Sequence, residues 1–190
     1  MTRLRARMRR AIVLPALGLL AALALTGCSK HHVYPTVEGL PVKIGGLDYT
    51  VFITRQLNVR DAEDRDYYPN APDLPPGSAY FGVFVEVCNN HSGGPALTPT
   101  SDFKIVDTQG GVYTPSPLPA NDIFAYRPIP LGSNKCIPVA GSIASGAPTG
   151  GALLLFRLPI AGIENRPLDL EIAPPATGES PKKERIELDI

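Results

Sequence analysis

The distribution of proline and glycine is the feature that most limits how this chain can fold. After Gly27 the chain holds 20 of its 21 prolines and 16 of its 18 glycines, and they are spread over the whole remaining length. Proline breaks the interior of a helix, and glycine there costs about 1 kcal/mol relative to alanine. Long helices are therefore excluded from residues 28–190, and we expect an all-β fold.

The clearest strand pattern covers residues 80–88. Its apolar side chains Phe81, Val83, Val85 and Val87 fall on one face at a period of two, so this face should point into a core. Shorter runs of the same kind recur between turn residues, at spacings typical of an antiparallel sandwich of seven or eight strands. We expect strands at 47–54, 80–88, 103–107, 112–114, 137–140, 152–158, 168–172 and 184–190.

The N-terminus has the three parts of an export signal. Five arginines lie within residues 1–10, and an uncharged run rich in alanine and leucine follows at 11–25. This run is too short to span a hydrocarbon core of about 30 Å, and small residues follow it. The pattern therefore predicts a cleaved signal rather than a membrane-spanning helix.

The residues at the cleavage point are more specific. Leu25-Thr26-Gly27-Cys28 resembles the lipobox of bacterial lipoproteins, which implies cleavage before Cys28 and attachment of lipid to its sulfur. The alternative is an ordinary secretory signal that has a cysteine there by chance. We predict a lipoprotein signal peptide at 1–27, a lipidated tether at 28–41 and one domain at 42–190, anchored at the extracytoplasmic face of the cell membrane.

The two remaining cysteines, Cys88 and Cys136, form an even pair in an exported chain. Their separation of 48 positions fits no common metal or redox motif, so we predict a structural disulfide. A redox-active or metal-binding thiolate pair is the alternative. Copper is disfavoured because the chain after Cys28 has no methionine, and we expect no cofactor.

Charge argues against one class of partner. Residues 28–190 hold 13 basic and 18 acidic side chains, a net charge of −5. Nucleic-acid binding needs a basic surface, so we exclude it.

The polar stretch at 60–76 holds an acidic cluster and two aromatic residues. Asp61, Glu63, Asp64 and Asp66 could supply oxygen ligands to calcium, but the EF-hand spacing is absent and a solvated acidic loop is the simpler interpretation.

Four aromatic residues either contact a partner or, as we favour, pack the loops onto the sandwich: Tyr67, Tyr68, Phe124 and Tyr126.

Catalytic motifs are missing from the sequence. His91 is the only histidine beyond the tether, and no Gly-x-Ser-x-Gly or phosphate-binding loop occurs. Ser101 and Lys104 have the spacing of a Ser-x-x-Lys nucleophile motif, but on a strand they would point to opposite faces. We therefore expect that this protein is not an enzyme.

The order of these segments resembles a family of immunoglobulin-like extracellular domains of unknown function, found on lipoproteins of Gram-positive bacteria. The resemblance covers about residues 43–172 and rests on strand patterns: a turn and strand at 46–51, an apolar strand at 83–87 followed by Asn89-Asn90, strands at 103–107 and 111–113, and an apolar strand at 151–159. It implies an immunoglobulin-like antiparallel β-sandwich and brings no catalytic or binding residues. Two departures are Cys88, between the apolar strand and the asparagines, and the length of the proline-rich stretch 115–150.

Together these patterns predict a lipid-anchored cell-envelope protein. Its leading function is a non-enzymatic binding or structural module whose partner, beyond the membrane itself, is a protein of the envelope. The alternative is an accessory factor in envelope redox or metal handling that uses Cys88 and Cys136 or the acidic cluster.

Overall fold

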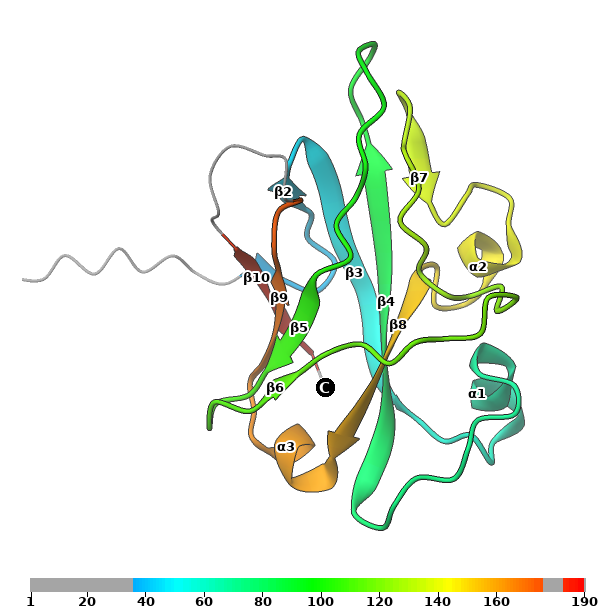
Figure 1. Ribbon diagram of the computed structural model, residues 1–190, viewed down its shortest axis with the longest axis vertical. Helices are drawn as coiled ribbons and strands as arrows, with labels where there is room; N and C mark the ends of the chain where they lie inside the picture. Colours follow the sequence, from blue (N-terminus) through cyan, green and yellow to red (C-terminus); the bar gives the residue numbers. More distant parts are fainter. Residues whose placement is uncertain (1–35, 176–182, 190) are drawn as a thin grey trace, which may run out of the picture. The chain divides into compact units, whose positions relative to one another are not determined.

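A computed structural model describes residues 36–175 and 183–189, which belong to one compact unit. Its two sheets pack face to face as a β-sandwich, so the chain is all-β, as predicted (Figure 1). Sheet A has the order β1-β10-β9-β5-β6, and sheet B has the order β2-β3-β4-β7 with β8 also paired to β4. Every strand pair is antiparallel except β1 with β10.

The described residues form ten strands and three short helices. The strands are β1 (Thr36–Val37), β2 (Val42–Ile44), β3 (Leu47–Leu57), β4 (Ser78–Asn89), β5 (Phe103–Val106), β6 (Val112–Tyr113), β7 (Lys135–Ile137), β8 (Ala152–Pro159), β9 (Leu168–Ile172) and β10 (Glu184–Leu188). The helices are α1 (Ala62–Tyr67), α2 (Ile143–Gly146) and α3 (Ile160–Glu164).

Each of the eight expected strands has a counterpart among these ten. The two additional strands, β1 and β2, are short. β2 joins β3 through the two-residue turn Gly45-Gly46, where both glycines have positive φ, as a tight hairpin requires. The strand expected at 137–140 instead ends at Ile137, because Pro138 has no N–H with which to continue the ladder.

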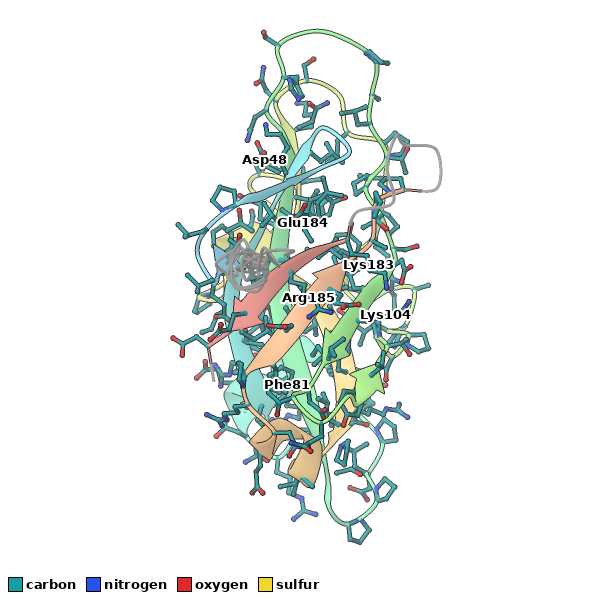
Figure 2. The ribbon with its side chains drawn as sticks, turned by 90° about the vertical axis from the view of Figure 1, so that its left-hand side faces the viewer. Asp48, Phe81, Lys104, Lys183, Glu184 and Arg185 are labelled. Atoms are coloured by element: carbon teal, nitrogen blue, oxygen red, sulfur yellow. A yellow bond between two sulfur atoms is a disulfide. The ribbon has the colours of Figure 1, made fainter. Side chains whose placement is uncertain are left out.

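The core lies between the two sheets. The predicted inward face of β4, formed by Phe81, Val83, Val85 and Val87, is fully buried there. The outer face of sheet A carries ion pairs instead: Arg185 Nη2 lies 2.5 Å from Glu171 Oε1, and Lys183 Nζ lies 3.4 Å from Oε2 of the same carboxylate (Figure 2). Sheet A therefore has the buried and solvated faces that its alternating sequence predicts.

Sheet B is covered on part of its outer face as well. A second apolar cluster there joins side chains of β3, β4 and β8 to α1, α2 and the stretch 115–150: Leu57, Tyr67, Tyr68, Tyr80, Phe84, Phe124, Ala144, Leu153 and Leu155. α1 and α2 lie on this side of the sheet (Figure 1). Burial on both faces explains why β4 and β8 are apolar at nearly every position.

The proline-rich stretch 115–150 is tied to the edge of β8. The Ser116 N–H donates to the Leu155 carbonyl. The Leu153 N–H donates to the Phe124 carbonyl at 2.6 Å, and the Tyr126 N–H donates to the Leu153 carbonyl at 2.9 Å. These bonds occupy the edge of β8 that β4 does not pair, so the stretch is fixed without forming a long strand.

Candidate functional site

The pairing of β4 with β7 places Cys88 directly opposite Cys136. The two sulfurs are bonded at 2.06 Å, with Cα atoms 4.1 Å apart, so the predicted disulfide is confirmed. In this state neither sulfur is a thiolate, which is the form that binds metal. The bond joins the end of the best-packed strand to the proline-rich stretch.

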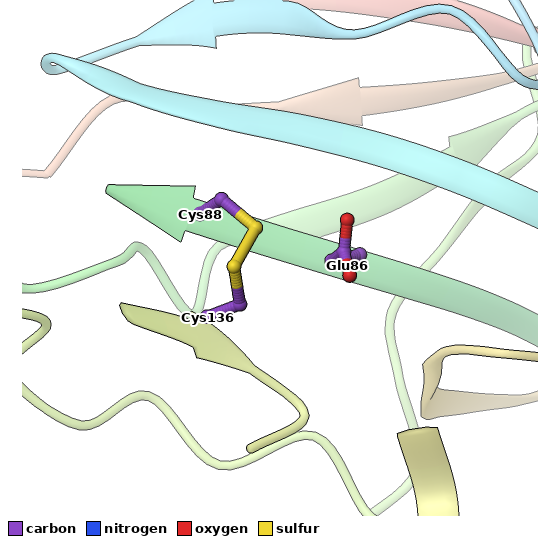
Figure 3. A group of neighbouring side chains, drawn as sticks. All are labelled: Glu86, Cys88 and Cys136. Carbon is purple, nitrogen blue, oxygen red and sulfur yellow. A yellow bond between two sulfur atoms is a disulfide. The ribbon is translucent and has the colours of Figure 1, made fainter. Parts of the chain in front are cut away.

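Glu86 lies beside this disulfide on the same face of β4 (Figure 3). A carboxylate oxygen of Glu86 and the sulfurs of Cys88 and Cys136 all lie within 4.8 Å of one another. Among the described residues no hydrogen bond or ion pair to the Glu86 carboxylate is found, and its partial burial raises its pKa. A carboxyl group whose pKa is raised by burial therefore adjoins the two sulfurs.

Asp48 lies on the other side of Cys88, across the β3–β4 pair. Burial alone would raise the pKa of Asp48, but hydrogen bonds from Asn90 and Lys43, at 2.8 and 3.1 Å, and the charge of Lys43 hold it below the usual value. His91 lowers this pKa further. The disulfide is therefore flanked by two acids whose pKa values are shifted in opposite directions: the pKa of Asp48 is lowered, and the pKa of Glu86 is raised.

The acidic cluster does not converge on one point. Asp61 caps α1 by accepting the Glu63 N–H at 2.9 Å. Asp64 is buried, against the expectation of a solvated loop, and accepts from Arg55 Nη2 at 2.5 Å and from the Asn58 N–H at 2.8 Å. Within the described ranges, the only group of three metal-type ligands is the one formed by Glu86 and the two cysteines. Asp61 and Asp64 thus serve the local fold.

The four candidate contact aromatics are buried, which confirms that they pack the loops. Tyr67 and Phe124 stack edge to face, with ring centroids 4.9 Å apart. Tyr68 packs on Tyr80, and the Tyr126 hydroxyl donates to the buried Thr100 carbonyl at 2.8 Å.

The Ser-x-x-Lys residues are not brought together as a nucleophile and its base. Lys104 Nζ lies 3.3 Å from Asp102 Oδ1, and Ser101 precedes β5. His91 is exposed in the loop after β4.

The structure also shows a surface that sequence reasoning missed. Four large aliphatic side chains from the proline-rich stretch are exposed, and we call them the aliphatic surface: Ile123, Ile129, Val139 and Ile143, at 58%, 45%, 58% and 63% of their full areas. The first three line a hollow of about 190 Å³ whose other walls include Arg127 and Pro138.

Ile143 lines an adjoining hollow of about 410 Å³, together with Phe124, Glu63 and Asp66. Phe124 lines both hollows. The hollow beside Ile143 has two acidic side chains, Glu63 and Asp66, on the side of α1.

Comparison with protein-family models, with curated proteins and with solved structures gave no match. The resemblance to immunoglobulin-like lipoprotein domains therefore stays a prediction. Cys28, the signal peptide and most of the tether lie outside the described residues. Within the described residues, no helix has the length and apolar character needed to cross a membrane.

Proposed function

We propose that this chain is a lipid-anchored cell-envelope protein whose β-sandwich is a non-enzymatic binding module for another protein of the envelope. Both the N-terminal sequence and the described fold support this proposal. The basic, apolar and small-residue segments that end at Cys28 have the order of a lipoprotein signal. The described domain is a β-sandwich in which the residues considered for catalysis are not brought together.

The aliphatic surface is the observation that carries the binding role. Scattered single exposed side chains are ordinary, but grouped aliphatic side chains around a hollow mark a site of interaction. Ile123, Ile129 and Val139 line one hollow, and Ile143 lines the next. The stretch that bears them is held by the disulfide and by backbone bonds to β8, so little ordering is needed when a partner binds.

The chemistry of the rim indicates what kind of partner fits. Glu63 and Asp66 line the hollow beside Ile143, and Asp66 is exposed. The chain after Gly27 carries a net charge of −5. A protein segment with an aliphatic or aromatic anchor flanked by lysine or arginine would complement both the floor and the rim.

Site-specific photo-crosslinking in cells that express the full chain tests this role. A photoreactive residue in place of Ile143 or Ile123 should give one discrete adduct with a second protein. Val112 is the matched control, because it is 58% exposed but lies on β6 in the other sheet. Equal adducts at Val112, no adduct at either isoleucine, or an adduct with a second copy of this chain would each contradict the proposal.

Charge reversal at the rim tests the chemistry of the partner. Asp66→Lys should reduce the yield of the Ile143 adduct, because it would repel the basic residues of the partner. Glu164→Lys makes the same change at an exposed position at the end of α3 and should leave the yield unchanged. Equal loss in both variants would mean that net charge, and not the rim, controls binding.

A further inference from the structure

The sulfurs of the disulfide differ in access and in surroundings. Cys88 is 8% exposed and sits in β4, flanked by β3, whereas Cys136 is only partly buried and belongs to the three-residue strand β7 at the end of sheet B. A thiolate attacks a disulfide along the S–S axis, from behind the sulfur that it will bond. Approach to Cys136 comes from the side of β7 that pairs with no other strand of the sheet. Approach to Cys88 comes from the side of β3, which is paired directly with β4 there and places Asp48 opposite Cys88.

Protonation of the sulfur that leaves assists the breaking of the bond. When Cys136 is attacked, Cys88 leaves as a thiolate inside a largely buried environment, which disfavours the charge. The Glu86 carboxyl lies within 4.8 Å of both sulfurs and has no competing partner among the described residues. It is therefore placed to give its proton to Cys88 and to take it back when the bond re-forms.

From this geometry we propose that Cys88–Cys136 is an exchangeable disulfide, attacked at Cys136 by a protein dithiol of the envelope, with Glu86 as the proton donor to Cys88. In the first step the partner's thiolate bonds Cys136 Sγ, the Sγ–Sγ bond breaks, and Cys88 leaves with its electron pair and receives the Glu86 proton. The second partner thiol loses its proton and attacks the partner's sulfur in this mixed disulfide, and Cys136 leaves with its electron pair and takes up a proton from solvent. This chain gains two electrons, and the partner is oxidised to its own disulfide.

Few other charged groups surround the face of β4 that carries Glu86 and Cys88. Asp48 on β3 faces Cys88, with Lys43 and His91 beside it, and Lys135 adjoins Cys136 in β7. Thr50, which faces Glu86 across the β3–β4 pair, carries no charge. A titration that follows Glu86 can thus be separated from that of Asp48 by comparing single variants.

Reduction of the full chain by dithiothreitol tests the role of Glu86. The rate is followed on the peptides that contain Cys88 and Cys136, after alkylation and mass spectrometry, so that Cys28 does not interfere. The rate constant is then expressed per dithiothreitol thiolate, from about pH 5 to about pH 8. For the natural chain we expect it to be about tenfold higher at the acid end, where Glu86 carries its proton.

Two variants separate proton transfer from simple repulsion. Glu86→Gln should give a flat profile that lies below the natural chain at the acid end. If Glu86 acted only by its negative charge, the variant would instead match the acid-end value of the natural chain at every pH, and the proposal would fail. Asp48→Asn removes a neighbouring charge and should keep the slope of the natural chain.

The site of attack has its own readout. Glutathione, a monothiol, should leave a mixed disulfide on Cys136 and a free Cys88, which acid quenching traps. An adduct mainly on Cys88 would overturn the assignment of the attacked sulfur. A disulfide that is reduced only when the domain unfolds, as followed by circular dichroism in the same samples, would overturn the proposal altogether.

Discussion

Removing the disulfide should destabilise the domain because the unfolded chain gains conformational entropy. The perturbation is Cys88→Ser combined with Cys136→Ser, which leaves no new free thiol at this site. The bond closes a loop across 48 positions. On the chain-entropy model, a loop of this size restricts the unfolded chain enough to stabilise the fold by about 4 kcal/mol.

The native state should keep its shape without the bond, because other contacts hold β7 in place. The Asn134 N–H donates to the Asn89 carbonyl at 2.7 Å, and Asn89 Nδ2 donates to the Leu131 carbonyl at 2.9 Å. Leu131 also exchanges two backbone hydrogen bonds with Leu97. The loss should therefore appear as lower global stability and not as local disorder.

Thermal unfolding followed by circular dichroism measures the effect. A domain of this size loses about 2–4 °C of its thermal midpoint for each kcal/mol, so we expect a fall of about 8–16 °C. Cys28→Ala is the control and should leave the midpoint unchanged. An unchanged midpoint in the double variant, or loss of the native spectrum before heating, would refute this reasoning.

Three further substitutions probe single contacts. Asp64→Ala should lower the free energy of unfolding, measured in urea, by about 3 kcal/mol, because the Arg55 guanidinium loses its buried carboxylate partner. A decrease below about 1 kcal/mol would contradict this. Tyr126→Phe should cost about 1–2 kcal/mol in the same assay, since the Thr100 carbonyl loses its buried donor, and no change would mean that water replaces the hydroxyl. Burial raises the pKa of Glu38 from 4.5 to about 7, so its contribution to stability is full below about pH 4.5 and is lost as the pH rises through 7. Glu38→Gln should therefore flatten the curve of unfolding free energy against pH between these values. An unchanged curve would show that another group causes the fall in stability.

The strands could be predicted because the sequence pattern that marks a strand lies within the strand itself and its flanking turns. A period of two with turn residues at each end marks β4 and β10 whatever they pair with. α1 was missed because its six residues are too few for a helical period, although Asp61 before Ala-Glu-Asp is a capping signal. β2 was missed for the same reason, because its three residues are too few to show a period of two.

The candidate sites could be predicted only in part. The number of cysteines and the expectation of export were enough to pair Cys88 with Cys136. The place of Glu86 beside Cys136 depends on the register of β4 with β7, which the sequence of the irregular stretch does not encode by any period. The aliphatic surface is harder still, because Ile123 and Ile143 lie 20 positions apart and meet only through the fold.

Mass spectrometry of the N-terminal peptide tests the membrane anchor most directly. Protein recovered from the membrane fraction of cells that express the full chain should begin at Cys28, with a diacylglycerol on its sulfur. Cys28→Ala should abolish that peptide and leave the chain released or unprocessed. A membrane-bound natural chain that retains residues before Cys28, or that begins elsewhere with the Cys28 thiol free, would contradict the lipid anchor.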